Sequence, residues 1–257
     1  MALRETSVRP TPTCLIRWEI FAVLAVSLGA SALNAVLSLI GSLLSKASLA
    51  SQSTTLVGPE SANNTYDLLL QLATIAENVA PVVLVLYLFA RANEPLSMIG
   101  LDGTQKGRDA ARGTVLAALI GGSGLALYVV AFKLGASLNV VPEDFPAIWW
   151  RIPVLVLYAI QNGLLEEVLM IGYLLTRLEQ LRVRPWLAIL ISATVRGSYH
   201  LYQGFGAFVG NMVMGLIFGV LFYRWRRVLP FIIAHSLIDA GAFIGYALLH
   251  GKVSWLP

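Results

Sequence analysis

The sequence predicts an all-α membrane protein, a polytopic bundle of about seven transmembrane helices. Of its 257 residues, 57% are hydrophobic and only 12% are charged, and the mean hydropathy is +0.74. A soluble globular domain has about 25% charged residues. The apolar residues also fall in runs of roughly 20, the length that crosses about 30 Å of hydrocarbon as a helix. Because lipid offers the backbone no hydrogen-bond partners and the runs show little strict alternation, we expect helices rather than a barrel.

Seven apolar runs are the candidate spans, and short polar connections separate them. They cover residues 18–44, 67–90, 113–136, 149–176, 186–203, 205–223 and 229–249. The longest connections are residues 46–66, which are rich in Ser, Thr and Asn, and residues 92–112, which contain helix-breaking Pro and Gly. We expect a single integrated membrane domain, with N-terminal transmembrane helices and loops in residues 1–94 and a core in residues 95–257.

Lysine and arginine are concentrated at alternate connections, which predicts the orientation in the membrane. One side carries Arg4, Arg9, Arg17, Arg91, Lys106, Arg108, Arg112, Arg177, Arg182, Arg184, Arg224, Arg226 and Arg227. The other side carries only Lys46, Lys133, Arg151 and Lys252. The rule that positive loops stay inside predicts a cytoplasmic N-terminus, in the plasma membrane if the host is bacterial. The net charge of +4 is explained by this topology and by anionic lipid, so we expect the bilayer as a partner and no nucleic acid.

Ionisable residues inside the predicted spans are the candidate functional residues, because a charge at membrane depth is costly and is usually functional. They are Glu77, Glu166, Glu167, Arg196, His200, His235 and Asp239. Counted at about 1.5 Å per residue, those in the C-terminal half lie at similar depths. Arg196 with His200 and His235 with Asp239 are spaced i, i+4, which places each pair on one helix face. We therefore expect a polar cavity built by three helices, with Asn211 as a further lining residue.

Two hydrolytic chemistries suit this set. In one, Glu166 acts as a general base and, with His200, polarises a water that attacks a peptide carbonyl, while His235 stabilises the oxyanion. In the other, Glu166, His200 and His235 hold Zn²⁺ with an open position for water. The compact H-E-x-x-H pattern of zinc proteases is missing from the sequence, so no cofactor is predicted and zinc remains the alternative. Each residue taken singly also suits a structural contact between helices.

Three segments carry a resemblance to a known family. They read EEVLMIGYLLTRL (166–178), RGSYHLYQG (196–204) and PFIIAHSLID (230–239). In this order they resemble the CPBP family of intramembrane proteases, which includes the CAAX prenyl endopeptidases and bacterial relatives linked to bacteriocin immunity. The resemblance extends over residues 95–249. It implies a helical protease, with a cavity open to the cytoplasm, that hydrolyses a peptide bond near the C-terminus of a membrane-associated or lipidated protein or peptide.

The resemblance also implies roles for individual residues. Glu166 matches the glutamate that activates water, Glu167 its neighbour and His200 the partner histidine. His235 and Asp239 match the pair that binds the oxyanion. The family pattern has been read both as a metalloprotease and as a metal-free protease, and we favour the metal-free reading.

The sequence departs from the family pattern at three positions. Ile171 replaces the arginine of Glu-Glu-x-x-x-Arg, and Arg196 replaces a phenylalanine one turn before the motif histidine. We expect Arg196 to return the missing guanidinium and hold Glu167. Asp239 replaces the commoner asparagine, and because a carboxylate cannot donate a hydrogen bond unless protonated, we expect it to orient His235. Tyr199 is interpreted as an interfacial or packing aromatic. The altered Ile171 position leaves open a non-catalytic scaffold or immunity factor of the same fold.

Overall fold

The computed structural model describes residues 12–252 and consists mainly of helices. Arg4 and Arg9, on which the predicted orientation partly rests, lie outside this range. The helices are α1 (Thr13–Ala25), α2 (Leu28–Leu44), α3 (Asn64–Arg91), α4 (Lys106–Lys133), α5 (Arg151–Glu166), α6 (Leu175–Gln180), α7 (Pro185–Ser198), α8 (Phe205–Trp225) and α9 (Leu229–Leu249). Between them lie the 3-10 turns η1 (Leu49–Ser51), η2 (Leu96–Ile99) and η4 (Leu201–Gln203), and a π-helix, η3 (Glu167–Leu174).

Five helical segments of the described chain are long and apolar enough to cross a membrane. They are α3, α4, the continuous segment Arg151–Gln180, α8 and α9, and the pair α1 and α2, bent by 50°, makes a sixth if it is one span. The expected run 186–203 forms only the 14-residue helix α7. That is about 21 Å of helix, short of the roughly 30 Å of hydrocarbon. The expected count of seven and the cytoplasmic N-terminus therefore stay predictions.

The fold is mainly helical, as predicted, and it also contains a small parallel sheet that was not predicted. Strand β1 (Ser53–Val57) pairs with β2 (Asn139–Glu143), with Ser53 opposite Asn139 and Val57 opposite Glu143. Both strands lie in polar connections, where five residues rich in Val and Thr are too short to register as a strand pattern. Parallel strands need a long crossover connection, and here α3 and α4 run away from the sheet and back to supply it.

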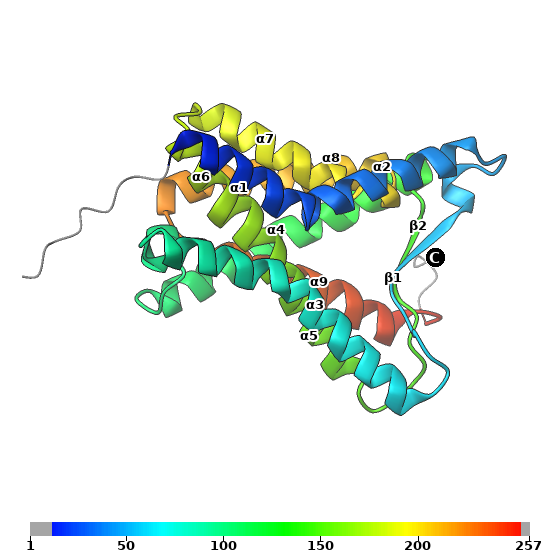
Figure 1. Cartoon of the computed structure of the whole chain (residues 1–257). Helices are drawn as coiled ribbons and strands as arrows, with labels where there is room; N and C mark the ends of the chain where they lie inside the picture. The colour runs from blue at the N-terminus through cyan, green and yellow to red at the C-terminus, as the bar shows by residue number, and fades with distance from the viewer. Residues whose placement is uncertain (1–11, 253–257) are drawn as a thin grey trace, which may run out of the picture.

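The helices form two sides that diverge toward the sheet (Figure 1). On one side α2 packs on α7 and α7 on α8, and on the other α5 packs between α3 and α9. Figure 1 shows the two sides close together near α6 and far apart at the opposite end, where β1 and β2 run between them.

Glycines set the closest helix contacts near the middle of the bundle. A Cβ on Gly163 of α5 would lie 2.4 Å from the Ser236 hydroxyl and 2.9 Å from the Ile232 carbonyl oxygen, both on α9. A Cβ on Gly215 of α8 would lie 3.0 Å from the Cα of Ala193 in α7. These helices could not approach so closely with larger residues. The approach of α5 to α9 brings the two glutamates beside His235.

Ion pairs join the connections at the narrow end of the molecule, which we call the arginine-rich end (residues 92–112, 177–184 and 224–228). Arg227 donates to Asp109 at 2.7 Å and to Asp102 at 3.0 Å. Both Asp109 and Arg227 are buried. Hydrogen bonds from Arg227 and Thr104 hold the pKa of Asp102 well below its ordinary value. This carboxylate therefore stays ionised and keeps the inner connection joined to the start of α9.

Replacing Arg227 by alanine is expected to lower the free energy of unfolding by about 3–5 kcal/mol, because Asp109 would be left as a buried charge without a partner. Thermal unfolding of the purified protein in detergent measures the loss. The neighbouring Arg226→Ala is the matched control, since its pair with Glu179 is 47% and 44% exposed. Exposed pairs contribute about 0–1 kcal/mol. Equal losses in the two variants would contradict the buried pair as a determinant of stability.

Candidate active site

Glu166 and Glu167 lie where α5 passes into the π-helix η3. A π-helix is rare, and short π segments occur often at functional sites. The Ser192 hydroxyl of α7 donates to the Met170 carbonyl at 2.8 Å and so supports the irregular backbone. Glu167 is fully buried and Glu166 is 8% exposed. The two neighbouring carboxylates thus differ in setting, one enclosed by protein and one at the edge of a cavity.

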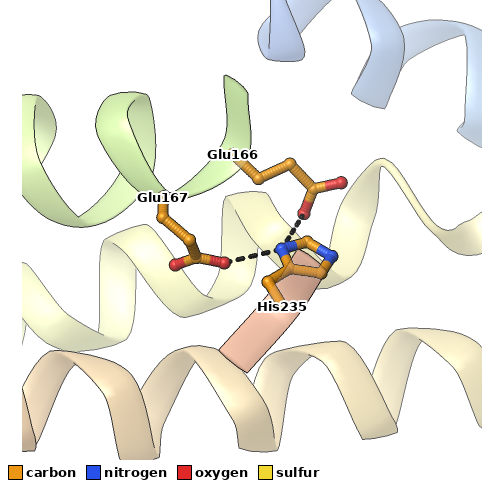
Figure 2. A group of neighbouring side chains, drawn as sticks. All are labelled: Glu166, Glu167 and His235. Atoms are coloured by element: carbon orange, nitrogen blue, oxygen red, sulfur yellow. Dashed lines mark hydrogen bonds and ion pairs between the residues drawn. The ribbon is translucent and has the colours of Figure 1, made fainter. Parts of the chain in front are cut away.

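A single guanidinium nitrogen joins three of the predicted site residues. Arg196 Nη2 lies 2.7 Å from Glu167 Oε1, 3.2 Å from Glu166 Oε2 and 3.1 Å from His235 Nδ1. His235 Nδ1 is also 2.8 Å from Glu167 Oε1 (Figure 2). Arg196 itself is fully buried. The contact between Arg196 and Glu167 expected from the missing arginine at position 171 is confirmed, and Ile171 is fully buried in the apolar core.

Tyr199 is a site residue that the sequence analysis missed. Its hydroxyl donates to Glu166 Oε2 at 2.7 Å, and its side chain is buried. The interpretation as a packing or interfacial aromatic is therefore wrong. The available signal was its place in RGSYHLYQG, between Arg196 and His200.

His200 lies close to Glu166, as predicted. Its i, i+4 spacing from Arg196 predicted that both residues lie on one helix, and that prediction is wrong. Helix α7 ends at Ser198, and His200 occupies the turn before η4. Its Nε2 is 3.6 Å from Glu166 Oε2, and Gln203 lies 3.3 Å from its Nδ1. Among the described residues, the buried Nε2 has no hydrogen-bond partner. A free ring nitrogen therefore lies beside the carboxylate.

Asp239 is near His235 but is bound by another residue. Its Oδ1 is 3.6 Å from His235 Nε2, too long for a hydrogen bond, while its Oδ2 accepts from Asn162 at 2.9 Å. Asn162 was not among the predicted site residues, although it stands one helical turn before Glu166 in the sequence. Because Glu167 and Arg196 engage Nδ1 of His235, its Nε2 is the ring nitrogen left for a reacting group.

These residues line one cavity of about 530 Å³. Glu166, His200, His235, Asp239 and the expected Asn211 belong to its wall. The rest of the lining comes mainly from Leu56, Val57, Gly58, Glu60, Gln71, Thr74, Asn78, Tyr158, Gln161, Asn162, Tyr199, Tyr202 and Gln203. The cavity therefore extends from the glutamates toward the β1–β2 sheet, at the end opposite the arginine-rich one. The expected cytoplasmic opening of the cavity and the expected cytoplasmic N-terminus stay predictions.

The zinc alternative does not fit this arrangement. The cluster whose ligand atoms lie within 4.8 Å of one another is Glu166, Glu167 and His235, not the predicted set with His200. Arg196 Nη2 already lies within 3.2 Å of an atom of each of these three residues. Zinc ligands bind at about 2.0–2.2 Å, so an ion there would have to displace a buried guanidinium. The guanidinium of Arg196 therefore already supplies the positive charge that a metal ion would bring to these three residues.

Replacing Arg196 by methionine is expected to lower the free energy of unfolding by about 3–5 kcal/mol, because Glu167 would lose its cation in a buried site. Arg196→Met combined with Glu167→Gln is expected to lose less than Arg196→Met alone, since the charge and its partner are removed together. Thermal unfolding of the four proteins of this cycle, wild type included, gives the coupling energy. Strictly additive losses would argue against the pair.

Comparison with known proteins supports the resemblance drawn from the motifs. Residues 148–241 match the family model described as type II CAAX prenyl endopeptidase Rce1-like. No curated protein and no solved structure gives a significant match. The matched region runs from the start of α5 to α9 and contains every predicted catalytic residue. Over this region, about a third of the chain, the sequence is similar to the CPBP family of CAAX-type intramembrane proteases.

Proposed function

We propose that the chain is an intramembrane endopeptidase that hydrolyses a peptide bond by means of a glutamate-activated water. The observation that carries the proposal is the position of Glu166 on the cavity wall, with His200 Nε2 3.6 Å from its Oε2. A water molecule that lies beside both groups can be hydrogen-bonded by the carboxylate and the imidazole at once. The family match over residues 148–241 supports the reaction class.

In the proposed reaction, Glu166 takes a proton from the water while the oxygen attacks the carbonyl carbon of the substrate. The new C–O bond gives a tetrahedral intermediate with a negative oxygen. Glu166 then passes the proton to the leaving nitrogen as the C–N bond breaks, which restores the carboxylate. The Tyr199 hydroxyl and Arg196 hold one carboxylate oxygen, Oε2, at 2.7 and 3.2 Å and so fix the direction in which the base points.

His235 is the proposed donor to the oxyanion. Its Nε2 is the ring nitrogen that Glu167 and Arg196 leave free, and the ring lies on the cavity wall. The ring donates from Nε2 in the tautomer whose Nδ1 accepts from Arg196, or as the imidazolium whose Nδ1–H is donated to Glu167. Asp239 is proposed to act on this ring through its charge, 3.6 Å from Nε2, rather than to bind the oxyanion, because Asn162 holds it as a hydrogen-bond acceptor at 2.9 Å. Fixed donors aimed at developing charge are usually the largest single contribution to catalysis.

The proposed substrate is a membrane-associated or lipidated protein or peptide, cut near its C-terminus as the family description suggests. The cavity combines apolar walls, such as Leu56, Val57 and Phe243, with polar side chains such as Gln71 and Asn162. Such a mixed lining suits an extended segment whose backbone amides need partners. The protein works as an integral membrane protein, and its partners are the lipid bilayer and the polypeptide that it cuts.

Replacing Glu166 by glutamine is expected to lower kcat by about 10²- to 10⁴-fold, since the general base is removed without a change of shape. The measurement is cleavage of a library of peptides from membrane-protein C-termini by the purified protein in detergent. Glu179→Gln makes the same chemical change at an exposed carboxylate of the arginine-rich end, and full activity is expected.

The same variant separates a protease from a non-catalytic scaffold or immunity factor. A scaffold would keep its cellular phenotype in Glu166→Gln, because the isosteric side chain preserves the shape of the cavity. A retained phenotype together with no cleavage by the wild-type protein would overturn the protease proposal.

Cleavage is expected to continue unchanged in the presence of a strong chelator, and added Zn²⁺ is expected not to raise it. The reason is that the buried guanidinium of Arg196 already balances the donor set of Glu166, Glu167 and His235. Peptide cleavage before and after dialysis against chelator is the measurement. Activity lost to the chelator and restored by Zn²⁺ would move the assignment to a metalloprotease.

A further inference from the structure

The cavity has a closed side and an accessible side. Toward the arginine-rich end, the space beyond the two glutamates is filled by large side chains that are at most 1% exposed, namely Met170, Tyr173, Phe218, Phe222 and Phe231. These belong to one apolar core. None of the residues lining the cavity comes from the connections 92–105, 181–184 or 226–228. Packed side chains therefore block that route to Glu166.

In the opposite direction the cavity reaches the surface near the sheet. Glu60, which follows β1, is exposed and belongs to the cavity wall. Thr74 of α3 donates to Glu60 Oε1 at 3.0 Å, and Asn78, one turn further along, is also an exposed wall residue. Figure 1 shows the two sides of the bundle far apart at this end. A polypeptide would enter the cavity past the exposed wall residues Glu60 and Asn78.

The positive charges lie at the closed end. Of the thirteen lysines and arginines that predict the cytoplasmic side, eleven remain when Arg4 and Arg9 are set aside as outside the described residues. The end with the sheet carries four, namely Lys46, Lys133, Arg151 and Lys252. Several of the eleven are paired with carboxylates, but the rule counts Lys and Arg rather than net charge, so the pairing does not weaken it. The rule therefore predicts that the closed end is the cytoplasmic one.

We propose that the substrate reaches Glu166 from the non-cytoplasmic side of the membrane. That the substrate is a polypeptide rests on the proposed function. The direction from which it enters rests on the cavity and on the distribution of Lys and Arg. The substrate class is then a peptide or protein segment presented on the outer face or from the outer leaflet. The cytosolic tails of prenylated proteins lie on the opposite side.

Single cysteines test the direction of access. Cys14 is the only cysteine of the chain, so Cys14→Ser gives a background without thiols. Thr74→Cys places a thiol on the cavity wall, away from Glu166, with little change of size. Gly107→Cys places one near the start of α4 at the arginine-rich end, where an added Cβ meets no atom within 4 Å. Intact cells that express the full chain are treated with a small membrane-impermeant maleimide, and the same cells are then permeabilised and treated again.

The proposal requires Thr74→Cys to be labelled in intact cells and Gly107→Cys to be labelled only after permeabilisation. The reverse pattern, with Gly107→Cys labelled in intact cells and Thr74→Cys protected until permeabilisation, would show a cytoplasmic cavity and overturn it. Labelling needs no catalysis, so the result is the same in a Glu166→Gln background. A failure of the protease proposal therefore leaves the direction of access decided independently.

Discussion

The site depends on the buried guanidinium of Arg196. Glu166 and Glu167 are adjacent in sequence and both lie out of water, a situation in which two carboxylates repel each other and each loses its solvation. Arg196 Nη2 lies within 3.2 Å of both and within 3.1 Å of His235. One cation thus holds residues of α5, η3 and α9 around a side chain of α7. Without it, two adjacent carboxylates would lie in the core with no cation beside them.

This arrangement divides the side chains between support and reaction. Arg196 engages Glu167 and Nδ1 of His235, and both of these side chains are buried. Glu166, His200 and Nε2 of His235 are the groups that remain available to a substrate in the cavity. Gly163 and Gly215 also contribute to this arrangement. Gly163 allows α5 to approach α9 closely, and Gly215 of α8 leaves room for the Arg196 side chain of α7. Small residues at the helix contacts therefore make room for the large buried side chain of Arg196.

The sequence was a good guide to helices and to the charge balance, and a poor guide to short elements and neutral partners. Apolar runs predicted the long helices because burial in lipid imposes a minimum length, and the exchange of Ile171 and Arg196 predicted the pair with Glu167 because a buried charge needs a partner. Strand β1 escaped detection because five residues in a polar connection carry no usable period. Tyr199 and Asn162 escaped because a hydroxyl or an amide costs little to bury and so does not stand out in an apolar run. Their roles depend on the turn after α7 and on the pairing of α5 with α9, which only the fold supplies.

The sheet connects the cavity mouth to the chemistry. Leu138, just before β2, donates its backbone N–H to the Gln203 carbonyl at 3.1 Å, and Ser137 forms an isolated bridge with Gly204. Gly204 has a φ of +104°, and a Cβ there would lie 2.7 Å from the Cα of Ser137, so this contact needs glycine. The turn held in this way carries His200, whose position beside Glu166 is not fixed by a helix. Strand β2 also pairs with β1, whose end lines the cavity. The backbone contacts that join the start of β2 to the turn therefore also position the His200 imidazole relative to Glu166.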